Sequence, residues 1–195
     1  MDTRQKIILT AYETFYKQGF HACGVELLAQ QAGITKRTLY AHFGSKDGLI
    51  AAVLDYRHHD FVERMQTALN RQPESQTVEA YLQFIADWTH ETDFCGCLFL
   101  HACAEYTDPD SEPHRTAAAH KHQIRQILQQ RLHTAGVDNA VTTANHAFLI
   151  GEGMIAAAQA VRDATDDYDD LTVDEANFEI REAFTGCELV HDTHR

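Results

Sequence analysis

The sequence lacks the features of several large classes of protein. No uninterrupted apolar run approaches the roughly 20 residues of a membrane-spanning helix, and no signal peptide opens the chain. There are five cysteines, an odd number that does not suit a framework of disulfides. We therefore expect a cytoplasmic protein with no membrane partner.

Alternation with a period of two is also missing, as are internal repeats and low-complexity segments. Almost every segment instead spaces its apolar residues three or four positions apart, which predicts helices. No nucleophile–base pair with an orienting group, no phosphate loop and no catalytic carboxylate pair stands out. We expect an all-α protein of about nine helices that is not an enzyme and uses no cofactor or metal.

Basic residues are scarce, with 16 against 29 acidic residues and a net charge of −13 over 195 residues. The deficit is uneven along the chain. Residues 1–50 hold six basic and four acidic side chains, whereas the remaining 145 hold 10 basic and 25 acidic ones. This asymmetry predicts a slightly basic module that reads nucleic acid, attached to an acidic body.

The stretch GITKRTLYAHFGSK, residues 33–46, predicts the turn and second helix of a helix-turn-helix. Gly33 suits the left-handed end of one helix, and Thr35 is a good N-cap for the next. Leu39 and Phe43 give that helix only a narrow apolar stripe. Its other side chains can hydrogen-bond or meet phosphate: Lys36, Arg37, Thr38, Tyr40 and His42. A short helix docked in this way suits the major groove of DNA.

Helical spacing divides the chain into a three-helix head and a larger body. We expect a DNA-binding domain over residues 1–48 and a ligand-binding and dimerisation domain over 49–195. A long helix capped by Ser45 would couple the two. The predicted helices cover residues 3–18, 25–32, 36–43, 46–70, 78–91, 97–106, 114–134, 140–162 and 174–190.

The dipeptide G19-F20 and the run VELLAQQAGITKRTLYAHFGSKDGLI over residues 25–50 resemble the TetR family of transcriptional regulators. The run joins a turn, a recognition helix and an exit helix in register. The resemblance implies an all-helical homodimer that binds a near-palindromic operator, most often as a repressor. It also implies an effector pocket in each body and a dimer interface built from the last two helices, 140–162 and 174–190.

The resemblance assigns expected roles within the head. Tyr40 and Lys46 would hold phosphates with Thr38 and His42 beside them. Lys36 and Arg37 would read base edges, next to the cap residue Thr35. The chain departs from the family at Cys23-Gly24, where a hydroxyl pair is usual. There we expect the backbone N–H groups at Gly24 to meet phosphate instead.

Candidate effector contacts are large apolar side chains that helical spacing also permits as plain core. They are Phe61, Met65, Trp88, Phe99 and Phe148. We expect the helix at 97–106, which is apolar over most of its circumference, to be the most buried and to form one wall of the cavity. On that helix His101 would orient the effector. Glu105 is also a candidate effector contact, and its carboxylate would need a histidine, a hydroxyl, a water or the ligand as a partner.

An alternative hypothesis is that the same helix forms a thiol- or metal-responsive site, since Cys97, His101 and Glu105 follow one another at four-residue intervals. Cys95, Cys103 and His114 lie nearby in sequence. No paired C-x₂-C or H-x₃-H spacing supports a closed zinc site. We favour core and pocket lining over a sensor, and over a metal-dependent enzyme.

Overall fold

The structure is a computed structural model that describes residues 2–161, and within that range it contains helices, turns and loops but no strand. The head consists of three helices, whose bounds are those predicted from the sequence. They are α1 (Thr3–Gln18), α2 (Val25–Ala32) and α3 (Lys36–Phe43). The predicted all-α fold is confirmed.

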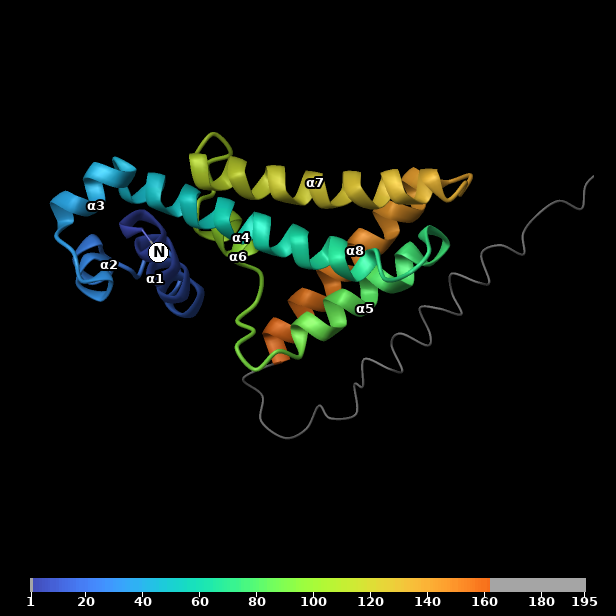
Figure 1. Ribbon diagram of the computed structural model, residues 1–195, viewed down its shortest axis with the longest axis horizontal. Helices are drawn as coiled ribbons and strands as arrows, with labels where there is room; N and C mark the ends of the chain where they lie inside the picture. The colour runs from blue at the N-terminus through green and yellow to red at the C-terminus, as the bar shows by residue number, and fades with distance from the viewer. Residues whose placement is uncertain (1, 162–195) are drawn as a thin grey trace, which may run out of the picture.

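The body is built on two long helices, α4 (Lys46–Leu69) and α7 (Glu112–Thr134), which pack side by side (Figure 1). A 3₁₀ turn (Glu74–Gln76) leads into α5 (Thr77–Thr89), and α5 packs against α8 (Ala140–Val161) across the end of the body that is far from the head. The short α6 (Leu98–Glu105) packs along α7 near the head.

The ends of the head helices follow the local signals in the sequence. Gly33 adopts the left-handed conformation, with φ of 67°, and ends α2. The Thr35 hydroxyl accepts a hydrogen bond from the Thr38 N–H at 3.1 Å and opens α3. The Ser45 hydroxyl accepts one from the Gly48 N–H at 2.9 Å and opens α4. Side chains therefore satisfy N–H groups that a helix leaves without intrahelical partners.

One apolar core runs from the head into the body. Phe15 on α1 and Phe20, just past that helix, are fully buried, and their ring centroids lie 5.1 Å apart. The helix α4 begins beside the head and continues through the body core with Ile50, Val53 and Leu54. One continuous helix, α4, therefore packs on both the head and the body.

Two predictions about the body need correction. The helix α6 is not the most buried, because three of its eight residues are buried against eight of thirteen in α5. The reason is that α6 is short and lies at the edge of the body beside the head (Figure 1). The loop expected through Pro113 also ends earlier, since α7 begins at Glu112 with Pro113 in its first turn, where proline is well tolerated.

The ninth predicted helix, at 174–190, lies outside the described residues. The division at residue 48 falls inside α4 and stays a prediction. Along residues 2–161 no helix is both long enough and apolar enough to span a bilayer.

Candidate functional site

The helix α3 is held to the head by the fully buried Leu39 and the half-buried Phe43, and most of its polar side chains are exposed. Lys36, Arg37 and His42 are exposed, and Tyr40 keeps 45% of its surface accessible. Thr38 is half-buried, as is Lys46 at the start of α4, and Thr35 is exposed. The side chains proposed to meet DNA therefore surround one end of the molecule.

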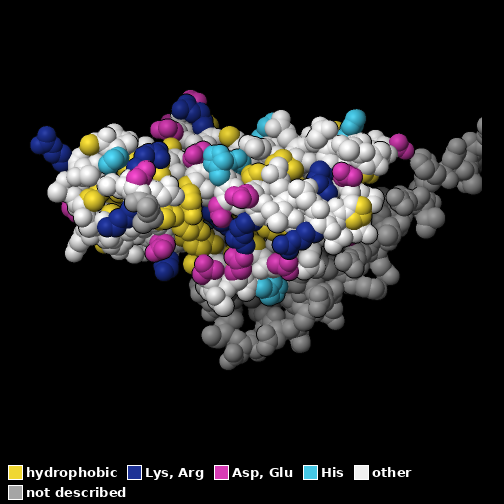
Figure 2. Space-filling model, in the orientation of Figure 1, with side chains coloured by type: hydrophobic (Ala, Val, Ile, Leu, Met, Phe, Trp, Pro, Cys, Tyr) yellow, Lys and Arg dark blue, Asp and Glu magenta, His cyan; other side chains and the backbone are white. Residues whose placement is uncertain are grey.

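Basic and acidic side chains are interspersed over this surface (Figure 2). Figure 2 shows Lys, Arg and His side chains over the head, at the end of the molecule that carries α3. Lys36 is paired with Glu26 of α2, with Nζ 2.5 Å from Oε1, and this hydrogen bond lowers the pKa of Glu26. Sequence spacing did not reveal this pair, because Glu26 lies ten residues earlier on another helix.

The start of α2 has no cap from the side chain of its N-cap residue, which is Gly24. Glu26 in the first turn instead accepts a hydrogen bond from its own backbone N–H. The neighbouring Cys23 is fully buried, and its thiol donates to the Gly19 carbonyl at 3.0 Å. The thiol therefore cannot cap the helix. The Glu26 carboxylate occupies one N–H group of the first turn, next to the exposed Gly24.

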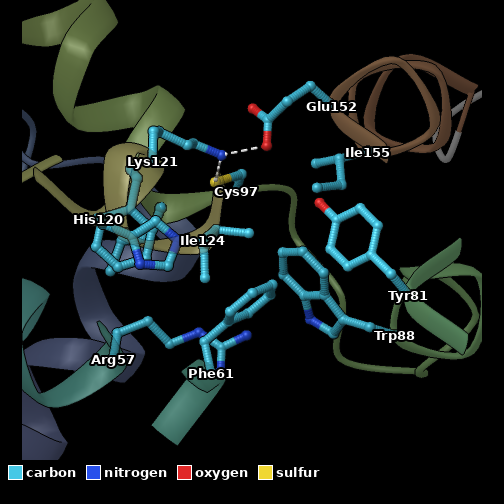
Figure 3. A pocket seen from close by; sticks show the side chains of 12 residues that line it. Arg57, Phe61, Tyr81, Trp88, Cys97, His120, Lys121, Ile124, Glu152 and Ile155 are labelled. Atoms are coloured by element: carbon cyan, nitrogen blue, oxygen red, sulfur yellow. Dashed lines mark hydrogen bonds and ion pairs between the residues drawn. The ribbon is translucent and has the colours of Figure 1, made fainter. Parts of the chain in front are cut away.

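A second candidate site is a cavity enclosed by α4 to α8 (Figure 3). Its walls are largely aromatic and aliphatic, with charged groups at opposite sides. The lining residues are Arg57, Phe61, Tyr81, Trp88, Cys97, Leu98, Phe99, His120, Lys121, Ile124, Glu152 and Ile155. The cavity volume is about 10 Å³, room for about one water, so a larger molecule must displace wall side chains.

Three predicted effector contacts, Phe61, Trp88 and Phe99, line this cavity. Two others do not. Met65 is fully buried in the core outside the lining, and Phe148 is half-buried with the Arg125 guanidinium 5.9 Å from its ring centroid.

His101 and Glu105 also lie away from the cavity, contrary to expectation, because His101 faces α8 and Glu105 faces the head. His101 hydrogen-bonds the side chain of Gln159 at 2.8 Å. Glu105 instead accepts hydrogen bonds from the N–H groups of Phe20 at 2.8 Å and His21 at 2.6 Å, between α1 and α2. The His21 imidazole lies 3.0 Å from the same carboxylate. We call this contact between body and head the Glu105 clamp.

The clamp is supported by close packing on both sides. Gly19 has φ of 81°, and a Cβ at that position would lie 3.0 Å from Glu105 Oε1. Tyr106 stacks on His21 with ring centroids 4.8 Å apart, and its hydroxyl donates to Asp47 Oδ1 at 3.3 Å. Burial opposes ionisation of Glu105, but the hydrogen bonds from His21 and Phe20 outweigh it and lower its pKa.

The polar groups of the cavity were missed by sequence reasoning. The Lys121 ammonium donates to Glu152 Oε1 at 2.7 Å and to Cys97 Sγ at 3.3 Å. Arg57 donates to Asp60 and lies over the rings of Phe61 and Trp88, 5.7 and 5.3 Å from their centroids. The sequence did contain a signal that Arg57 is buried. It lies at helical spacing on the same face of α4 as the apolar residues Ile50, Val53, Leu54 and Phe61.

Burial, with Lys121 and the other nearby positive groups, lowers the pKa of His120 to about 2. His120 is therefore neutral at physiological pH; it stacks on Phe99 at a centroid distance of 3.5 Å, and its Nδ1 lies 2.8 Å from His58 Nδ1. Burial would lower the pKa of Lys121 as well, but Cys97 and Glu152 raise it, so this group is charged.

The cysteines and histidines do not gather into a metal site in the described part of the chain, where no three His, Cys, Asp or Glu side chains could hold an ion together. None of the four cysteines there is in a disulfide. Cys97 is buried, Cys95 and Cys103 are half-buried, and the His114 Nδ1 bonds the Tyr106 carbonyl.

A docked helix with an exposed polar face, preceded by a left-handed glycine turn, defines a DNA-binding helix-turn-helix protein. Comparison with known proteins agrees. The sequence model described as bacterial regulatory proteins, tetR family, matches residues 7–53. The crystal structure of SCO4454, a TetR-family transcriptional regulator from Streptomyces coelicolor, is 31% identical, covers 81% of this chain and 84% of that one, and has a TM-score of 0.76.

Two curated proteins are also similar. The regulator YjdC of Escherichia coli is 25% identical over 84% of this chain and 86% of its own. The transcriptional activator FasR of Mycolicibacterium smegmatis is 37% identical, over 43% of this chain and 41% of its own. The chain belongs to the TetR family, and it is a DNA-binding transcriptional regulator rather than an enzyme.

Proposed function

We propose that this regulator is a repressor that binds a near-palindromic operator as a homodimer and responds to a small molecule in the body cavity. The observation that carries the proposal is the geometry of α3, which is anchored by the buried Leu39 while its N-terminal half is exposed. Arg37 and Lys36 read base edges in the major groove, and Lys36 exchanges Glu26 for DNA on binding.

The phosphate contacts surround this reading helix. Tyr40 and Lys46 hold the backbone of one strand, with Thr38 and His42 beside them and Thr35 at the cap. The N-terminus of α2 at Gly24 takes a further phosphate through the N–H groups that Glu26 does not occupy. Such contacts position the head on the duplex, whereas the base contacts of Arg37 carry the sequence preference.

A second copy of the chain packs on α8. This helix exposes Val141 by 60% and Leu149 by 64%, and Ala156 and Ala157 are also exposed. Small residues on this face let two helices approach closely. The predicted helix at 174–190 completes the interface. The two-fold arrangement sets two α3 helices about 34–36 Å apart, which is one turn of DNA.

The effector acts through two connections between body and head. One is α4, which carries Arg57 and Phe61 of the cavity and begins at Lys46 beside α3. The other is α6, which lines the cavity with Phe99 and ends in the Glu105 clamp. A molecule that binds better to one spacing of the heads shifts the dimer toward that spacing. Repression needs only occupancy of the operator by the heads.

The test is selection of an operator from random duplex DNA with the whole chain, followed by binding measurements and a promoter fusion. We expect a two-fold symmetric site, binding by a dimer, and a rise in reporter output when the gene for this chain is deleted. Selection of no preferred sequence would contradict the DNA-reading role. A fall in reporter output on deletion would contradict the repressor role and leave the DNA-reading role intact.

A further inference from the structure

We propose that the cavity binds a planar aromatic carboxylate, with the carboxylate on Lys121 and the ring among Phe61, Trp88 and Phe99. This inference rests on the proposed role of the cavity as the effector site and names its ligand class. The residues concerned lie on α4, α5, α6 and α7 and line one cavity. Figure 3 shows Phe61, Trp88 and Lys121 pointing toward it.

The site for the anion is the Lys121 ammonium. It is part of the cavity wall and holds Glu152 Oε1 at 2.7 Å in an ion pair. The two side chains keep 18% and 20% of their surfaces exposed, so the pair lies where the cavity meets solvent. A ligand carboxylate can replace Glu152 on Lys121 one for one, which leaves the displaced side chain facing water rather than buried without a partner.

The same wall disfavours a cation. The cavity already faces two positive groups, Arg57 and Lys121, against the single carboxylate of Glu152. His120 is neutral, as shown above, and Asp60 pairs with Arg57. The Arg57 guanidinium also lies over the rings of Phe61 and Trp88, the faces that a ligand cation would need. An anion can therefore take the place of Glu152 on Lys121, whereas a cation would find the faces of Phe61 and Trp88 already covered by Arg57.

The aromatic part follows from the arrangement of the wall rings. Phe61 and Trp88 meet edge to face, with centroids 5.2 Å apart and planes at 78°. Phe99 lies flat on His120, with planes at 6°. A flat ligand ring between Phe61, Trp88 and Phe99 can contact both the faces and the edges of these rings, the two contacts that aromatic pairs prefer. The small present volume requires the ligand to part these rings, which moves Phe99 on α6.

The chain carries its own reporter, because Trp88 is the single tryptophan of the sequence. Tryptophan fluorescence of the whole chain should be titrated with benzoate, benzamide and benzylamine, which share a ring and differ in charge. We expect benzoate to bind at least about tenfold more tightly than benzamide, and benzylamine to bind most weakly. Calorimetry of the same mixtures checks the affinities.

Two variants separate this assignment from a general loss of structure. Lys121→Met should weaken benzoate about tenfold while benzamide changes little. Glu152→Gln should tighten benzoate, because the competing carboxylate is gone. If the ion pair were only structural, both variants would lose benzoate affinity to the same extent. Lys17→Met, an exposed lysine on α1, is the matched control and should bind benzoate as the parent does.

Equal or tighter binding of benzamide or benzylamine would overturn the inference, as would a fall in benzoate affinity in both cavity variants. Operator binding is measured separately on the same protein. Benzoate binding by a chain that selects no operator would support this inference and contradict the DNA-reading role alone. Operator binding without any response of Trp88 to benzoate would overturn this inference and leave the DNA-reading role intact.

Discussion

The Glu105 clamp predicts a measurable link between the body and the head. In Glu105→Ala the N–H groups of Phe20 and His21 lose the carboxylate that they contact at 2.8 and 2.6 Å. The fully buried Phe20 cannot readily offer its N–H to water, whereas the exposed His21 can. Hydrogen bonds to a charged group contribute about 1.5–3 kcal/mol each. Since one of the two is partly replaced by water, we expect a loss of about 2–3 kcal/mol.

For a chain of this size that loss corresponds to a fall in Tm of roughly 5–10 °C. Thermal unfolding followed by circular dichroism gives the number, and Glu63→Ala, at an exposed position on α4, is the control. Glu105→Gln retains one acceptor oxygen, so its Tm should lie between those of Glu105→Ala and Glu63→Ala. Operator affinity should also drop in Glu105→Ala, because the head is less firmly oriented by the body. Equal Tm values for the Glu105→Ala and Glu63→Ala variants would refute the clamp.

Two further predictions concern the buried histidine and the dimer. The unfolded chain takes up a proton on His120 near pH 6.5, whereas burial lowers its folded pKa to about 2. The contribution of His120 to stability is therefore complete above about pH 6.5 and falls by up to about 1.4 kcal/mol per pH unit below it. In His120→Phe this part of the Tm–pH curve should be flatter than in the parent. Parallel curves for the parent and the variant would contradict the prediction. Ala157→Arg should give a folded monomer in light scattering while Ala118→Arg, exposed on α7, stays dimeric; a dimeric Ala157→Arg would place the interface elsewhere.

The head was predictable from sequence because its signals are local. A left-handed glycine at Gly33 and hydroxyl caps at Thr35 and Ser45 act within three or four residues of their own positions. Burial of Leu39 follows from its place on a narrow apolar stripe. The helix bounds in the head therefore agree with the structure residue for residue.

The cavity and the clamp were only partly predictable, because their contacts join distant segments. Helical spacing selected Phe61, Trp88 and Phe99, but the same spacing also selected Met65, which is plain core. Glu105 was read as a cavity residue, although its partners are 84 and 85 residues earlier in the chain. The residues around Glu105 in the sequence give no sign that its carboxylate accepts hydrogen bonds from two backbone N–H groups in the head.

The pairing of Lys121 with Glu152 was missed for the same reason. The two residues are 31 positions apart on α7 and α8, and each resembles an ordinary solvated charge in the sequence. Only the packing of the two helices brings their side chains together at the cavity wall.

The proposed reading of DNA by α3 is tested most directly by anisotropy of the selected operator with three variants at several salt concentrations. Lys46→Ala should weaken binding to every duplex and reduce the salt slope by about one. Arg37→Ala should cost about 1–3 kcal/mol on the operator and flatten the preference at particular base pairs. Arg115→Ala, exposed on the body, should bind as the parent does. Parental affinity and parental sequence preference in both Lys46→Ala and Arg37→Ala would contradict the assignment of α3 as the reading helix.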